Sequence, residues 1–172
     1  RFPGPESNHL IANSGPYAAW ISTAGHFVSP ETDMSAAESM TIEYWAKQEE
    51  EGYPDDGTSN PLGPDSGQNE DLLLQYRTAG GAWETLTRHD ANDPYGTVYT
   101  PTVTLTSSTH PDAFHSGFQL RFRQEGGSSQ DYWFVDDLVV ESDAGPDLTN
   151  DRYISGFEFD DTVLALVFSA GD

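Results

Sequence analysis

Apolar residues recur at every second position in several segments of this chain, and this alternation constrains the fold more than any other feature. Segment 39–47 places Met40, Ile42, Tyr44 and Ala46 on one face of an extended strand, because successive strand side chains point to opposite faces. Segments 72–78, 99–108 and 117–124 follow the same period. No segment shows the apolar spacing of a three-turn helix, so the sequence predicts an all-β protein.

The turns between these segments agree with that prediction. Gly80 and Gly81 join 72–78 to 83–88 as a tight hairpin, and the glycine–serine stretch 125–130 joins 118–124 to 132–140. Many short strands with closely spaced turns are typical of a β-sandwich or jelly roll. We therefore expect a two-sheet antiparallel jelly-roll sandwich, interrupted by a long acidic loop between Gln48 and Asn69.

The composition changes near the C-terminus and suggests a boundary. We assign residues 1–142 to the jelly-roll domain and 143–152 to a linker-like stretch. Residues 153–172 are then either the last strand of the same domain or the start of a following module. The chain begins with Arg1 and shows no signal peptide, which is expected of a mature product or a part of something longer.

The charge of the chain narrows the classes of partner. Its 29 acidic residues against seven Lys and Arg give a formal charge of −22, which disfavours nucleic acid and anionic membranes. No apolar run has the length of a membrane span. The chain has no cysteine, which excludes disulfides and thiolate metal sites without deciding the compartment; in secreted proteins that lack cysteine, bound calcium can stabilise the fold instead. A surface so rich in Asp also suits a saline habitat.

The stretch Asp131–Val140, DYWFVDDLVV, carries two adjacent carboxylates in an otherwise apolar strand. Regular alternation makes both faces apolar, so whichever face is buried carries Asp136 or Asp137 with it. A buried, unpaired carboxylate is costly, and a calcium ion would compensate it with its six to eight oxygen ligands. The alternative is that one carboxylate caps loop amides and the other is solvated.

An ordered set of segments resembles a known class of module. The set consists of SPETDMSAAESMTIEYWAK, the acidic loop, EDLLLQYRTAGGAWETL, TVTLT, FQLRFRQEGGSS and DYWFVDDLVV. Over roughly Val28–Glu141, it resembles the extracellular jelly-roll modules of the MAM and reelin-repeat type and their bacterial relatives in large surface proteins. The resemblance implies a non-catalytic adhesive or ligand-binding role, and a structural calcium ion near the Asp-Asp of the final strand.

In such modules an acidic residue near the domain start, often in a Phe-Glu dipeptide, joins the calcium site. Here the N-terminus has Phe2 and Glu6 without that dipeptide, whereas GFEFDD occurs at 156–161. The candidate ligands beside Asp136 and Asp137 are Glu6, Asn8, Glu70, Asp71 and Glu158.

Two groups of residues are candidates for ligand binding. Tyr53, Tyr95 and Tyr132 or Trp133 could stack on sugars, although filling the core is the alternative for the tryptophans. Arg121 and Arg123 share the face opposite Phe122 and could hold a carboxylate, or simply pair with surplus acids.

Catalytic signatures are absent from the sequence: the five histidines are scattered, and there is no nucleophile elbow or phosphate loop. We expect a non-enzymatic, extracellular or cell-surface module, bacterial in origin, that binds a glycan or surface polymer within a larger adhesin or polysaccharide-active protein. Neighbouring modules of the same chain are further expected partners. The alternatives are a structural spacer with no ligand of its own, and a jelly-roll polysaccharide lyase or hydrolase.

Overall fold

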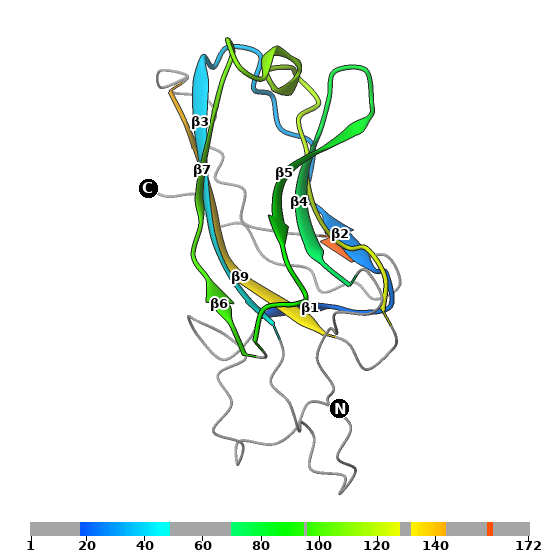
Figure 1. The fold of residues 1–172 in the computed structure, drawn as a ribbon. Coiled ribbons are helices and arrows are strands. Elements are labelled where there is room, and N and C mark those ends of the chain that lie inside the picture. The colour runs from blue at the N-terminus through cyan, green and yellow to red at the C-terminus, as the bar shows by residue number, and fades with distance from the viewer. Residues whose placement is uncertain (1–17, 49–69, 95, 128–131, 144–157, 160–172) are drawn as a thin grey trace, which may run out of the picture.

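The structure, a computed structural model, describes residues 18–48, 70–94, 96–127, 132–143 and 158–159. These residues form two antiparallel sheets that face each other as two layers (Figure 1). The described part contains no α-helix, and one 3-10 turn, η1 (Pro111–Ala113). The predicted all-β class and the two-sheet antiparallel arrangement are therefore confirmed. The acidic loop lies outside the described residues.

Sheet A has the order β1-β9-β3-β6, with β7 also paired to β3. Its strands are β1 (Ala19–Ile21), β3 (Ser39–Gln48), β6 (Val98–Tyr99), β7 (Thr102–Thr106) and β9 (Trp133–Ser142). The strands β6 and β7 follow one another along the same side of β3. Pro101 separates them, because proline has no N–H to donate to the sheet.

Sheet B has the order β10-β2-β8-β4-β5. Its strands are β2 (His26–Val28), β4 (Leu72–Arg77), β5 (Trp83–His89), β8 (Leu120–Gln124) and β10 (Glu158–Phe159). The predicted hairpin is β4–β5, and Gly81 takes a φ of +85° in its turn, a conformation that glycine adopts without steric cost. The short β10 pairs with β2 at the edge of this sheet.

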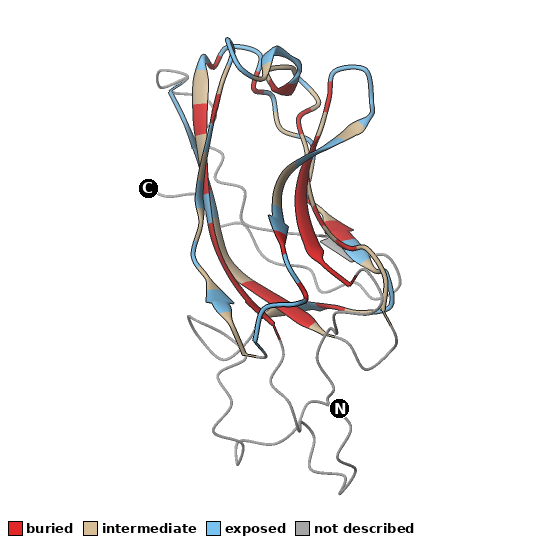
Figure 2. Cartoon of the chain, in the orientation of Figure 1, coloured by how far each residue is buried: buried red, intermediate tan, exposed pale blue. Residues whose placement is uncertain are grey.

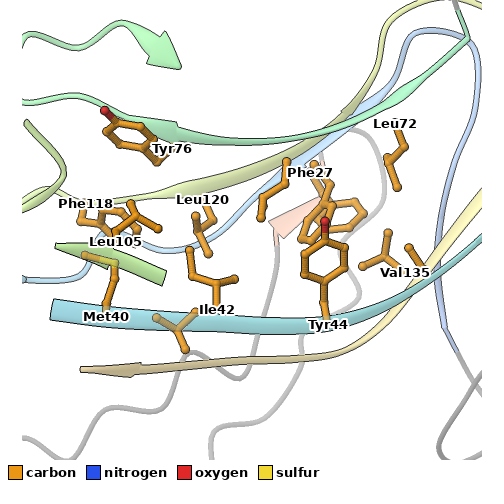
Figure 3. Close-up of a cluster of buried hydrophobic side chains, with 14 of the residues drawn as sticks. Phe27, Met40, Ile42, Tyr44, Leu72, Tyr76, Leu105, Phe118, Leu120 and Val135 are labelled. Carbon is orange, nitrogen blue, oxygen red and sulfur yellow. The ribbon is translucent and has the colours of Figure 1, made fainter. Parts of the chain in front are cut away.

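The core lies between the sheets and is built from the alternate residues that the period-two pattern selected. Its largest fully buried apolar side chains are Trp133, Phe27, Phe118, Phe122, Met40, Ile42, Leu72, Leu74, Leu105 and Leu120. Figure 2 shows the buried stretches along both layers, and Figure 3 shows Ile42 and Tyr44 of β3 pointing toward the opposite sheet. Burying each such side chain contributes about 1.5–3 kcal/mol.

The first residue after the domain boundary predicted at Ser142 makes hydrogen bonds to the sheet. Asp143 accepts hydrogen bonds from the backbone N–H groups of Glu38 and Ser39, both at 2.8 Å, and from the Ser39 hydroxyl at 2.9 Å. These bonds lower the pKa of the Asp143 carboxyl. Asp143, predicted as the first linker residue, is thus attached to the start of β3.

Candidate functional site

The outer face of sheet B gathers most of the few basic side chains. Strand β8 turns Leu120 and Phe122 into the core, so Arg121 and Arg123 point outward. Their cross-strand neighbours on β4 are Gln75 and Leu73. We call this surface the arginine face, and it consists of Gln75, Arg77, Trp83, Arg88, Arg121 and Arg123. Four of the chain's seven Lys and Arg residues lie on it.

Arg121 is held in one position by its neighbours. Its guanidinium carbon lies 4.3 Å from the centre of the Trp83 ring, a cation–π contact. Its Nε and Nη2 donate to Gln75 Oε1 at 2.9 and 2.6 Å. Gln75 Nε2 in turn donates to Thr85 Oγ1 at 3.0 Å. The guanidinium is therefore preorganised, and its Nη1 is not used by these bonds.

The other two arginines of this face are neutralised by carboxylates. Arg77 Nη1 donates to Glu31 Oε1 at 3.1 Å and to Gln119 Oε1 at 2.9 Å. Arg88 donates from Nε to Asp71 Oδ2, and its Nη2 lies 2.9 Å from Glu125 Oε2. These two residues fit the interpretation that arginines pair with surplus acids.

Arg121 and Arg123 differ from them. Within the described part of the chain, no ion pair involves either residue, although the whole chain carries 29 acidic residues. Burial, and then the neighbouring Arg123, lower the pKa of the Arg121 guanidinium. Two neighbouring positive charges on this half-buried sheet surface therefore have no ion-pair partner among the described residues.

The predicted aromatic platform is only partly within the described residues, since Tyr53 and Tyr95 lie outside them. Trp133 is 0% exposed and donates from Nε1 to the Glu70 carbonyl oxygen at 2.8 Å. Its ring fills the core, which is the alternative that the sequence leaves open for the tryptophans. Tyr132 lies elsewhere, edge-on to the exposed Trp20 at 5.3 Å between ring centres.

The two adjacent aspartates occupy a β-bulge. Opposite the segment Glu43–Trp45 of β3, strand β9 contains one extra residue, and Asp137 has a left-handed φ of +51°. Trp133 and Val135 point inward before the bulge, and Leu138 and Val140 after it. The expectation that regular alternation carries one carboxylate into the core is wrong, because the extra residue changes the face. Both aspartates are half-buried.

Bulge geometry also determines the local contacts of these two carboxylates. Asp136 Oδ1 accepts a hydrogen bond from the backbone N–H of Asp137 at 2.9 Å. The described residues contain no group of three or more His, Cys, Asp or Glu side chains arranged to hold a metal ion. Two adjacent carboxylates are nevertheless the hard oxygen donors that calcium prefers.

The other metal candidates are separated from this bulge. Asp71 lies at the start of β4 in sheet B. Its carboxylate accepts a hydrogen bond from Arg88 and another, at 2.8 Å, from the backbone N–H of Ala91. Glu70 precedes it and is 0% exposed. Glu6 and Asn8 lie outside the described residues, and only the backbone of Glu158 is described, in β10. Asp71 therefore links the start of β4 to the end of β5 in sheet B. It is not brought together with Asp136 and Asp137, which belong to sheet A.

A buried polar layer, which the strand pattern does not predict, closes one end of the core. Gln48 and Gln124 enter it from opposite sheets, and both are 0% exposed. Gln48 Nε2 donates to the Ala91 carbonyl oxygen at 3.1 Å. The side-chain amide of Gln124 has no hydrogen-bond partner among the described residues. Alternation alone would have assigned apolar neighbours to both glutamines.

Comparison with known proteins adds no assignment. No protein-family model matches the chain, and neither does any curated protein. In the described segments, no helix is long and apolar enough to cross a membrane.

Two residues of the arginine face, Trp83 and Gln75, are not among the ligand-binding residues that the sequence predicts. The glycine hairpin that pairs Trp83 with Arg77 would have revealed both, because it sets Trp83, Gln75 and Arg121 on the outward face of adjacent strands.

Proposed function

We propose that this chain is a non-catalytic recognition module of a larger extracellular protein, and that its arginine face binds a glycan or another surface polymer. The observation that carries the proposal is the stack of Arg121 on Trp83, with Arg123 beside it, on the outward face of a paired sheet. Aromatic rings pack against the apolar faces of sugars. Fixed guanidinium groups supply several hydrogen-bond donors in one plane.

The position of these groups on strands supports a binding role. Side chains on a paired sheet lose little conformational freedom when a ligand arrives, so less of the binding free energy is lost to ordering. The hydrogen bonds from Arg121 to Gln75 and from Gln75 to Thr85 already hold the guanidinium in place. Side chains held in this way on a sheet suit an extended polymer.

The connectivity supports the jelly-roll part of the proposal. If β6 and β7 count as one interrupted strand, the sheet orders become 1-8-3-6 and 9-2-7-4-5, in which strand 9 is the two-residue β10 at the edge of sheet B. Each of the pairs β1 and β2, β3 and β4, and β8 and β9 is split between the two sheets. In a double-sheet jelly roll a long antiparallel hairpin folds over on itself, so consecutive strands at the fold belong to different sheets.

A structural calcium ion is the second part of the proposal, with Asp136 and Asp137 as its ligands. The two aspartates are consecutive residues in the bulge of β9, and both are half-buried, which supports this choice of ligands. Calcium bound there would supply no chemistry. It would stabilise the folded chain because it binds the native state and not the unfolded one.

The proposal is tested by titrating the protein into a panel of neutral and acidic polysaccharides, with Trp83→Ala and Trp20→Ala as variants. Both tryptophans lie on outer sheet faces, one on each sheet. We expect Trp83→Ala to weaken binding about tenfold or more, as loss of an aromatic contact does, and Trp20→Ala to leave it within twofold. Loss of binding only in Trp20→Ala would move the site to sheet A. A panel with no binding would favour the structural spacer.

A further inference from the structure

We infer that the ligand of the arginine face carries a carboxylate, as a uronic acid does, and that Arg121 and Arg123 hold this group. The inference rests on the proposed function and names the ligand class of the same site. It starts from a contrast between neighbours: Arg77 and Arg88 each have a carboxylate partner, whereas no described carboxylate pairs with Arg121 or Arg123.

Strand geometry brings the two guanidinium groups to the same surface. Arg121 and Arg123 are two residues apart on β8 and point to the same side of the sheet, so their backbones are separated by roughly 7 Å. Side chains of this length can converge on one small anion. Their neighbours on β2, Val28 and His26, are not acidic. Beyond Val28 in the Arg121 row comes Glu158 of β10, of which only the backbone is described.

The available donors match a carboxylate. Arg121 uses Nε and Nη2 for Gln75, which leaves Nη1 for a ligand. No hydrogen bond from the Arg123 guanidinium is found among the described residues, so its donors are also available. A carboxylate accepts about four hydrogen bonds through two oxygens, and arginine matches this planar geometry. The Trp83 ring next to Arg121 would contact the sugar ring that bears the carboxylate.

Because the chain has a net charge of −22, its affinity for an acidic ligand should depend on salt concentration in a distinctive way. At about 0.01 M ionic strength the screening length is about 30 Å, so the whole acidic chain repels an acidic ligand. At about 0.15 M the length falls to about 8 Å, and repulsion from distant acids is reduced more than the direct arginine contact. Affinity for an acidic ligand should therefore rise from low to moderate salt and fall again in concentrated salt.

The experiment compares matched ligands by calorimetry. The probes are short oligosaccharides of polygalacturonate, alginate and hyaluronan, each beside its carboxyl-reduced form, with a sulfated carrageenan oligosaccharide as a third class. We expect at least one uronate oligosaccharide to bind at least tenfold more tightly than its carboxyl-reduced form. Equal binding of the two forms, or binding of only neutral or sulfated polymers, would overturn the carboxylate assignment while leaving glycan recognition in place. Failure of every probe here and in the neutral panel would overturn the proposed function itself.

Two variants and one control variant test whether Arg121 and Arg123 contact the carboxylate of the ligand. Arg121→Gln and Arg123→Gln should each weaken uronate binding about tenfold or more, because charge-assisted hydrogen bonds are lost, and should weaken binding of the carboxyl-reduced form by a smaller factor. Arg123→Gln leaves the stack of Arg121 on Trp83 intact, and an unchanged melting temperature would verify its fold. The control is Thr104→Glu, an exposed β7 position in sheet A, which shifts the net charge by the same one unit. An equal loss in the control would show that overall charge, and not this pair of arginines, governs binding.

Discussion

The hydroxyl of Tyr44 lies 2.7 Å from Nε2 of His89 inside the core, and the two residues belong to opposite sheets. The imidazole ring also lies 4.3 Å from the Tyr99 ring and 6.3 Å from the Trp133 ring, measured between ring centres. A polar contact thus joins the two layers beside a group of aromatic rings. Burial lowers the pKa of His89 to about 4 and raises that of Tyr44.

This contact predicts a loss of stability in mild acid. The pKa of His89 is about 4 when folded, against an ordinary value of 6.5. The unfolded chain therefore binds the proton first, and stability falls as the pH decreases from about 6.5 to about 4. The full effect is about 3 kcal/mol. Urea unfolding at pH 7 and pH 4.5 should show most of this loss, and a His89→Gln variant should have a much flatter dependence. An unchanged slope in the variant would contradict the assignment to His89.

The ion pair of Asp71 should matter more than the exposed pair of Glu31. The Asp71 side chain is 7% exposed and also accepts the Ala91 backbone N–H, whereas the Glu31 side chain is 61% exposed. Asp71→Ala leaves that N–H without its partner, so we expect a loss of about 2 kcal/mol in free energy of unfolding. The matched change Glu31→Ala should cost below about 0.5 kcal/mol. Similar losses measured by chemical unfolding would refute the distinction.

The turn between β1 and β2 is strained and can be improved. Thr23 and Ala24 have φ values of +58° and +57°, and the backbone N–H of Gly25 donates to the Ser22 carbonyl at 2.8 Å. Left-handed backbone is costly for residues other than glycine and asparagine. We expect Thr23→Asn and Ala24→Gly each to raise stability by about 0.5 kcal/mol.

The same turn offers a control substitution. A Cβ at Gly25 would come within 2.6 Å of the Ser22 carbonyl oxygen, so Gly25→Ala should lower the melting temperature by several degrees, roughly 2–4 °C per kcal/mol for a chain of this size. If Ala24→Gly also lowers the melting temperature, the strain interpretation is wrong.

Calcium dependence can be separated from backbone strain at the bulge. We expect calcium to raise the melting temperature relative to excess chelator, because the ion stabilises the native state. Asp137→Gly removes a carboxylate but accepts the left-handed φ of +51° without strain. This variant should therefore fold at least as stably as the parent in chelator while losing much of the calcium response.

Asp136→Asn provides the complementary measurement. It preserves a side-chain oxygen for the Asp137 backbone N–H and removes one negative charge, so it should weaken the calcium response without large loss of stability in chelator. A parent protein whose melting temperature is the same with calcium and with chelator would remove the calcium proposal.

Much of the strand pattern could be predicted because it depends on local periodicity. Met40, Ile42 and Tyr44 all point inward as their spacing predicts, and so do Leu120 and Phe122. The hairpin of β4 and β5 follows from its glycine turn. These features need only the two-residue period of a strand and the conformational freedom of glycine.

The bulge and the arginine face could not be predicted in the same way. The extra residue at Asp137 is visible only when β9 is paired with β3. One inserted residue turns every later side chain of the strand to the other face. Strand β9 therefore buries Leu138 and Val140 without burying either carboxylate in the core.

The sequence by itself determined which residues extend as strands, which faces are apolar, and how acidic the surface is, because each property belongs to neighbouring residues. Tertiary structure decided which strands lie side by side, and hence that Arg121 reaches Trp83 from two strands away and that Tyr44 meets His89 across the core. The reason is physical: pairing between strands depends on contacts between distant segments, whose free energy no local pattern contains.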